Sequence, residues 1–190
     1  MNHAAISLPR ILPRILVALV SMLIAFASGG CQSAPTVTAA DLNRLTGPMW
    51  TGTLTYRDYT TNKSTTIEST LQVVKVAGLP QVGNDYADAG VTPGWEFRFG
   101  YPREPKANST KIIALSPGGD KIGDELVTKR ATLPGGTLRI VTEKPGTDND
   151  RPALFQFHYN IAPNSFTLTK LVRPDGEGEF FERNKYQWSR

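Results

Sequence analysis

The sequence predicts an all-β protein: an antiparallel up-and-down β-barrel of about 8–10 strands, preceded by a short N-terminal helix. From Met49 onward, apolar and polar residues alternate with a period of two. Turn signals rich in proline and glycine separate the alternating segments, and no helical pattern is long. A sandwich of two stacked sheets is the alternative. We favour a barrel because hairpin follows hairpin and closure removes exposed strand edges.

The first residues have the layout of a secretory signal. Arg10 and Arg14 precede an apolar run over 15–26, and small residues follow it. The run is shorter than the roughly 20 residues that a membrane-spanning helix needs. We therefore expect residues 1–30 to be removed as a signal peptide.

Cys31, the only cysteine, directly follows Ser28, Gly29 and Gly30. Small residues before a cysteine resemble the cleavage site of bacterial lipoproteins, which implies a lipid on Cys31 as the membrane anchor. Those signals usually carry leucine where Ser28 stands. The alternative is cleavage after Ala25-Phe26-Ala27, which would release a protein that begins at Ser28.

The lipoprotein resemblance also implies a location in the bacterial cell envelope. Gln32 follows the cysteine, and the aspartate that retains lipoproteins in the inner membrane is absent there. We expect a lipid-anchored protein in the outer membrane that faces the periplasm.

A tether and a short helix are expected over 31–47, and the barrel over 48–190. Thr38 and Asp41 have the spacing of a capping box, and Leu42 and Leu45 lie on one helical face before Gly47. The helix is expected to plug one end of the fold or to fray as part of the tether.

The strands are expected in chain order, with a long loop over 77–93 and a proline-stiffened connection over 102–108. Four aromatic residues share one face of the third strand. The prolines and glycines of 145–152 are expected to form a turn. The expected strands cover 50–57, 65–76, 95–101, 111–115, 122–130, 138–143, 153–161, 165–173 and 180–189.

Composition argues against several classes of function. The formal net charge of +4 includes Arg10 and Arg14, and the remaining charges of both signs are interspersed, so we expect no nucleic-acid binding. One cysteine excludes an internal disulfide. His158 is the only histidine beyond the leader and is expected at the surface, so we expect no metal site, no cofactor and no enzymatic activity.

Three segments resemble an uncharacterised bacterial lipoprotein family: 50–59, 101–108 and 183–186. A tryptophan on the first strand after a short helix, with an arginine on the last strand, is also similar to the lipocalins and wider calycins. In that pattern the arginine packs over the tryptophan and closes the barrel. Lipocalins have Gly-x-Trp, whereas Gly47 here stands three residues before Trp50.

Aromatic residues on the inward faces could line a lumen or fill it. On the last strand, Glu182 and Asn184 share a face with Trp188, and Lys170 could face Glu182; a β-bulge would instead turn these side chains toward water. The candidate ligand-binding residues are Trp50, Tyr56, Trp95, Phe97, Phe99, Tyr101, Phe155, Phe157, Tyr159, Lys170, Glu182 and Trp188.

The leading functional hypothesis is a non-enzymatic envelope lipoprotein whose barrel binds a small apolar or amphipathic ligand. The alternative is a solid β-domain that docks on another envelope protein through an outer face or the 77–93 loop. A hydrolase or isomerase would need a cleft with convergent titratable groups.

Overall fold

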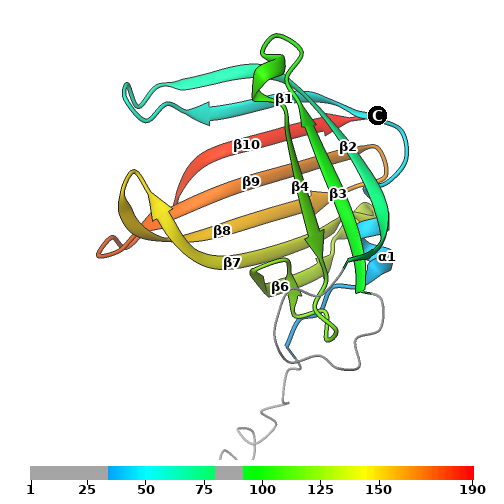
Figure 1. Ribbon diagram of the computed structural model, residues 1–190. Helices are drawn as coiled ribbons and strands as arrows, with labels where there is room; N and C mark the ends of the chain where they lie inside the picture. The colour runs from blue at the N-terminus through cyan, green and yellow to red at the C-terminus, as the bar shows by residue number, and fades with distance from the viewer. Residues whose placement is uncertain (1–33, 80–91) are drawn as a thin grey trace, which may run out of the picture. The chain divides into compact units, whose positions relative to one another are not determined.

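The computed structural model describes residues 34–79 and 92–190, so the leader and Cys31 lie outside the described residues. The described chain forms one ten-stranded sheet with a short helix beside it (Figure 1). The elements are α1 (Ala39–Asn43), β1 (Trp50–Arg57), β2 (Ser64–Leu79), β3 (Thr92–Gly100), β4 (Ser109–Ala114), β5 (Lys121–Ile122), β6 (Glu125–Thr132), β7 (Leu138–Asp148), β8 (Arg151–Ile161), β9 (Ser165–Pro174) and β10 (Phe181–Ser189), with single 3₁₀ turns at Pro105–Ala107 and Pro134–Gly136.

The topology confirms an antiparallel up-and-down barrel. Each strand lies beside its neighbour in sequence, and β1 also pairs with β10, which places the two ends of the barrel sequence side by side. A single bridge between Leu115 and Ile122 joins β4 to β5 and nearly closes the sheet. In Figure 1, β2 to β4 cross over β7 to β10, as expected of one curled sheet.

The short helix is part of the folded core. The predicted capping box is present: the Thr38 side chain accepts from the Asp41 backbone N–H, and the Asp41 carboxylate accepts from the Thr38 backbone N–H at 2.9 Å. Leu42 and Leu45 are fully buried, and Trp50 Nε1 donates to the Leu45 carbonyl at 2.8 Å. The helix therefore plugs one end of the barrel, which we call the α1 end.

Two strand predictions are wrong. The segment expected as one strand over 122–130 is split into β5 and β6, because Gly123 has a left-handed φ of 62° and turns the chain between them. The turn expected over 145–152 is confined to Asn149 and Asp150, both with positive φ.

Strands β7 and β8 instead continue through their prolines. Pro145 lies beyond Glu143, the last β7 residue paired with β6, and Pro152 lies before Ala153, the first β8 residue paired with β9. Each proline therefore has a paired strand on one side only, where a missing N–H is tolerated.

The predicted loop over 77–93 is shorter at both ends than expected. β2 continues to Leu79 and β3 begins at Thr92. The remainder, 80–91, lies outside the described residues. Among the helices of the described chain, none has the length and apolar character to cross a bilayer.

Candidate functional site

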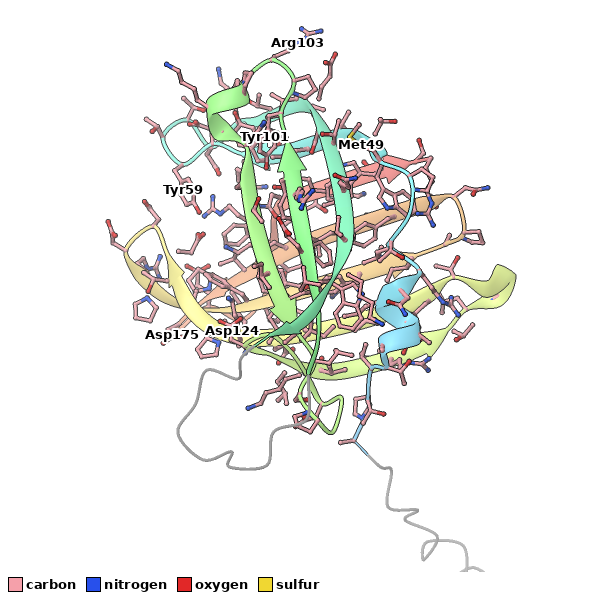
Figure 2. The ribbon with its side chains drawn as sticks, turned by 45° about the vertical axis from the view of Figure 1, so that its right-hand side comes forward. Met49, Tyr59, Tyr101, Arg103, Asp124 and Asp175 are labelled. Atoms are coloured by element: carbon pink, nitrogen blue, oxygen red, sulfur yellow. The ribbon has the colours of Figure 1, made fainter. Side chains whose placement is uncertain are left out.

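A pocket of about 350 Å³ opens at the end of the barrel opposite α1. Figure 2 shows Tyr59 and Tyr101, two of its lining residues, on the side away from the helix. We call this the open-end pocket. Its wall includes Leu54, Tyr56, Ile67, Lys170, Arg183 and Asn184.

Three polar side chains of the wall come from adjacent strands. In the sheet register Tyr56 of β1 lies opposite Asn184 of β10, and Asn184 lies opposite Lys170 of β9. Directly paired residues project from the same face of a sheet. These three residues, which we call the polar row, therefore form one line across three strands, and all are half-buried.

A β-bulge in β10 determines which charged residue enters the pocket. The pairing with β9 shifts register between Glu182 and Asn184, so Phe181 pairs with Val172 and the extra residue is Arg183. Glu182 is exposed, whereas Arg183 is only 11% exposed. The expectation that Glu182 lines the lumen is wrong, because the bulge reverses the inward and outward faces there.

Arg183 belongs to a charged group at the mouth of the pocket. It donates through Nε to Asp148 Oδ1 at 3.1 Å and makes a second hydrogen bond to Oδ2, while the Tyr59 hydroxyl donates to Oδ1 at 3.0 Å. Burial and the hydrogen bond to Asp148 raise the pKa of Tyr59. This mouth cluster of Tyr59, Asp148 and Arg183 ties the β1–β2 hairpin to the β7–β8 hairpin.

Lys170 differs from Arg183 in having no carboxylate partner in residues 34–79 and 92–190. Its ammonium lies 3.7 Å from the centroid of the Phe155 ring, and none of the ion pairs among the described residues involves it. Burial lowers the pKa of Lys170; Asp148 opposes this shift, and Arg183 adds to it. Arg57 also lines the pocket, but its guanidinium lies over the Phe181 ring, 5.5 Å from the centroid. Lys170 therefore brings to the inner wall a positive charge that no described carboxylate pairs directly.

The floor of the pocket is the aromatic core. Tyr101 shares a hydrogen bond of 2.8 Å with Tyr186, whose ring stacks on Trp188 with centroids 4.7 Å apart. Trp188 stacks in turn on Phe166 at 5.3 Å. Burial raises the pKa of Tyr186 and keeps its hydroxyl protonated. Along β10, Asn184 therefore lines the pocket while Tyr186 and Trp188 fill the barrel beneath it.

Most of the predicted lumen residues fill the barrel rather than line the pocket. Only Tyr56, Tyr101 and Lys170 of the predicted set line it, and Phe155 supports the Lys170 ammonium. The packed residues, buried or partly buried in the core cluster, are Trp50, Trp95, Phe97, Phe99, Phe157, Tyr159 and Trp188.

A second polar group lies inside the barrel near the seam between β4 and β6. Glu125 is 1% exposed and accepts hydrogen bonds from Tyr159 (2.7 Å), Thr142 (2.7 Å) and Lys111 (3.1 Å). Burial and the nearby Glu125 raise the pKa of Tyr159 well above its ordinary value. Because Glu125 is fully satisfied, the group stabilises the barrel wall.

The outer face of β8 carries His158. Its Nε2 lies 2.6 Å from Gln156 Oε1, and Gln156 in turn donates to Glu143 at 2.7 Å. Phe157 and Tyr159 on either side of it belong to the core, so His158 faces away from the pocket. The described residues include no group of three or more potential metal ligands.

Sequence reasoning missed Arg183, Asp148 and Tyr59 as parts of the site. Asp148 was expected in a turn, and the bulge that turns Arg183 inward has no signal in the alternation of β10. The sequence marks the segment 183–186 only through its resemblance to a lipoprotein family.

Comparison with protein-family models finds no match to the chain, and comparison with curated proteins finds none either.

Proposed function

We propose that the barrel binds a small amphipathic molecule in the open-end pocket and releases it unchanged. The observation that carries this proposal is the pocket itself: about 350 Å³, with apolar Leu54 and Ile67 in its wall and the polar row beside them. Sites for small molecules combine apolar walls with a few placed polar groups. A ligand with an apolar body and a polar end matches both parts.

Binding rather than catalysis suits the placement of the titratable groups. His158 faces the outside, and Asp148 is engaged by both Arg183 and Tyr59. Glu125 is enclosed in the barrel wall. A general base would have to be free to accept a proton within reach of the ligand, and Glu104 at the pocket rim is an exposed carboxylate without a positioning partner among the described residues.

We further propose that the protein is a bacterial envelope lipoprotein anchored through Cys31 in the outer membrane. The signal-like residues before Cys31 support this, and so does the small-residue stretch that separates it from the folded unit. Labelling of cells with a radioactive fatty acid is expected to mark the wild-type protein and to leave Cys31→Ser unmarked. Label on Cys31→Ser would refute the assignment.

A lipocalin-like relationship is supported by the packing at the α1 end. The Arg190 guanidinium lies 4.0 Å from the Trp50 ring centroid and donates to the carbonyls of Thr46 and Arg44 at 2.8 and 3.0 Å. This is the arginine-over-tryptophan contact that the resemblance implied. A shared architecture does not by itself bring a shared ligand.

The binding proposal is tested with a neutral fluorescent probe, N-phenyl-1-naphthylamine, and a pocket-filling variant. Ile67→Trp places an indole in the pocket and is expected to weaken binding at least tenfold. Ile112→Trp is the matched control, because Ile112 is 53% exposed on β4 and lies outside the pocket. Equal binding by both variants and the wild-type protein would exclude this pocket as the site.

Native mass spectrometry of the protein purified from its own host provides an independent readout. A retained small molecule, absent from Ile67→Trp and present in Ile112→Trp, is the expected result. A molecule retained equally by both variants would place binding elsewhere.

A further inference from the structure

We propose that the ligand is an amphipathic anion, a short apolar body with one carboxylate or phosphate, and that its charge pairs with Lys170. This inference rests on the proposed function and specifies the chemical class of the ligand.

Lys170 carries a positive charge that no described carboxylate pairs. The side chain is half-buried inside the barrel wall, and its ammonium lies against the Phe155 ring with no carboxylate of the described chain in ion-pair contact. A cation withdrawn from water needs a counter-charge or strong acceptors. The Phe155 ring supplies only part of this compensation, since an aromatic face attracts a cation without carrying an opposite charge.

Arg183, a second positive charge of the pocket wall, is paired with a carboxylate. Asp148, 4% exposed, takes two hydrogen bonds from the Arg183 guanidinium and one from Tyr59. Lys170 lines the same pocket as Arg183 but has no such partner among the described residues. The absence of a partner therefore distinguishes Lys170 from the structural charges of the mouth cluster.

The polar row provides a receptor for an anionic group. Tyr56, Asn184 and Lys170 stand in register on adjacent strands, which are about 4.8 Å apart. The Tyr56 hydroxyl, the Asn184 amide and the Lys170 ammonium are all donors, of the kind that the oxygens of a carboxylate or phosphate accept from. A cationic head group would instead lie beside Lys170 and Arg183, and like charges would repel it.

The aromatic core limits the length of the apolar part. Tyr186 and Trp188 occupy the barrel directly beneath Asn184 on the same face of β10. The apolar body must therefore fit within about 350 Å³ against Leu54 and Ile67. This volume is near the lower limit of small-molecule pockets and suits a short chain or a small ring system.

The experiment compares two probes that share one ring system. 8-Anilinonaphthalene-1-sulfonate is an amphipathic anion, and N-phenyl-1-naphthylamine is its neutral counterpart. Binding of each is measured by fluorescence titration with the wild-type protein, Lys170→Met, Lys170→Arg and the control Lys185→Met. Lys185 lies on β10 but pairs with Thr55 and Thr169 on the outward face, so its variant loses the same charge outside the pocket.

The expected result is at least tenfold weaker binding of the anionic probe by Lys170→Met, with binding of the neutral probe unchanged or tighter. Lys170→Arg and Lys185→Met should retain the preference for the anion. Near-ultraviolet circular dichroism confirms that each variant is folded. If Lys170→Met binds the anionic probe as the wild-type protein does, the inference is wrong while the binding proposal stands. If the wild-type protein binds neither probe, both fail.

A competition series separates the two kinds of anion. Hexanoate, hexyl phosphate and hexanol are each used to displace the anionic probe. Displacement by hexanoate identifies a carboxylate site, and displacement by hexyl phosphate alone identifies a phosphate site. Hexanol that competes as well as both anions would overturn the inference.

Discussion

The α1 end and the open end of this barrel treat their polar groups differently. At the α1 end, Asp41 is 3% exposed and takes two hydrogen bonds from Arg130, while the Trp50 and Trp188 indoles each donate a hydrogen bond. At the open end, Lys170 has no carboxylate partner within the part of the chain that the structure describes. The buried polar groups of the α1 end have hydrogen-bond partners, as a stable fold requires. At the open end, the charge of Lys170 destabilises the fold, and a bound anion would offset that cost. The contrast therefore separates the end that stabilises the fold from the end that we propose binds the ligand.

Substitution at the α1 end should have the largest effect. Trp50→Ala removes a fully buried indole, its hydrogen bond to Leu45 and its contact with Arg190. We expect a loss of about 3–5 kcal/mol in the free energy of unfolding, measured by urea denaturation. Met49→Ala is the control, since Met49 is 55% exposed and should change stability by less than about 0.5 kcal/mol. Similar losses for both would contradict a packed α1 end.

Asp41→Asn should have the next largest effect, about 1.5–3 kcal/mol, because it removes the charge that Arg130 binds. Burial raises the pKa of Asp41, but hydrogen bonds from Arg130 and Thr38 outweigh it and hold the pKa below its ordinary 3.8.

A carboxyl with a lowered pKa stabilises the fold above its ordinary pKa, and this contribution is lost as the pH falls through the folded value. The stability difference between the wild-type protein and Asp41→Asn should therefore be full at pH 7 and shrink below about pH 4. Urea denaturation at several pH values checks this. A difference that persists undiminished at pH 2 would refute the role of the charge.

Tyr59→Phe should cost less, about 0.5–1.5 kcal/mol, because it removes one hydrogen bond to Asp148 and leaves Arg183 in place. Hydrogen exchange should report faster opening of the β1–β2 hairpin, with the α1 end unaffected. Uniform acceleration across the barrel would show that the mouth cluster supports the whole fold.

Lys170→Met should change stability least, by no more than about 1 kcal/mol, because the lost cation–π contact and the relieved burial of charge oppose each other. The lowered pKa of Lys170 gives the sign of the pH dependence. The penalty for burying the charge is present while the ammonium is protonated and disappears as the pH rises through the ordinary value of 10.5.

Any stability gain of Lys170→Met over the wild-type protein should therefore shrink as the pH approaches 10.5, the ordinary lysine pKa. Thermal unfolding at pH 7 and pH 10 checks this. A large loss of stability at pH 7 would assign Lys170 a structural role and weaken the contrast between the two ends.

The sequence was sufficient for the fold and for most of the core. Alternation with a period of two predicts the strands, and the capping box at Thr38 and Asp41 locates the helix. The sequence could not reveal which inward residues pack and which line a pocket. Trp188 and Asn184 share one face of β10, and only the depth of each along the barrel separates core from site.

The bulge in β10 is the second feature that the sequence could not predict. Strict alternation puts Glu182 inward, and a single extra residue replaces it with Arg183 and reverses the sign of the charge at the mouth. Bulges depend on how neighbouring strands curve, and the local residue pattern carries little trace of them. The sequence predicts Lys170 facing Glu182, whereas in the structure Lys170 and Arg183 line the pocket and Glu182 is exposed.

The pairing of β1 with β10 has a consequence for how the chain acquires its shape. Thr51 lies opposite Ser189, so the pairing of β1 with β10 cannot be completed until residue 189 has been synthesised. Contacts between such distant parts of a chain slow folding. Removal of Trp188 to Arg190 deletes the Gly52–Trp188 and Thr51–Ser189 pairs, and we expect the weakened β1–β10 pairing to make the shortened chain more sensitive to proteases than the full one.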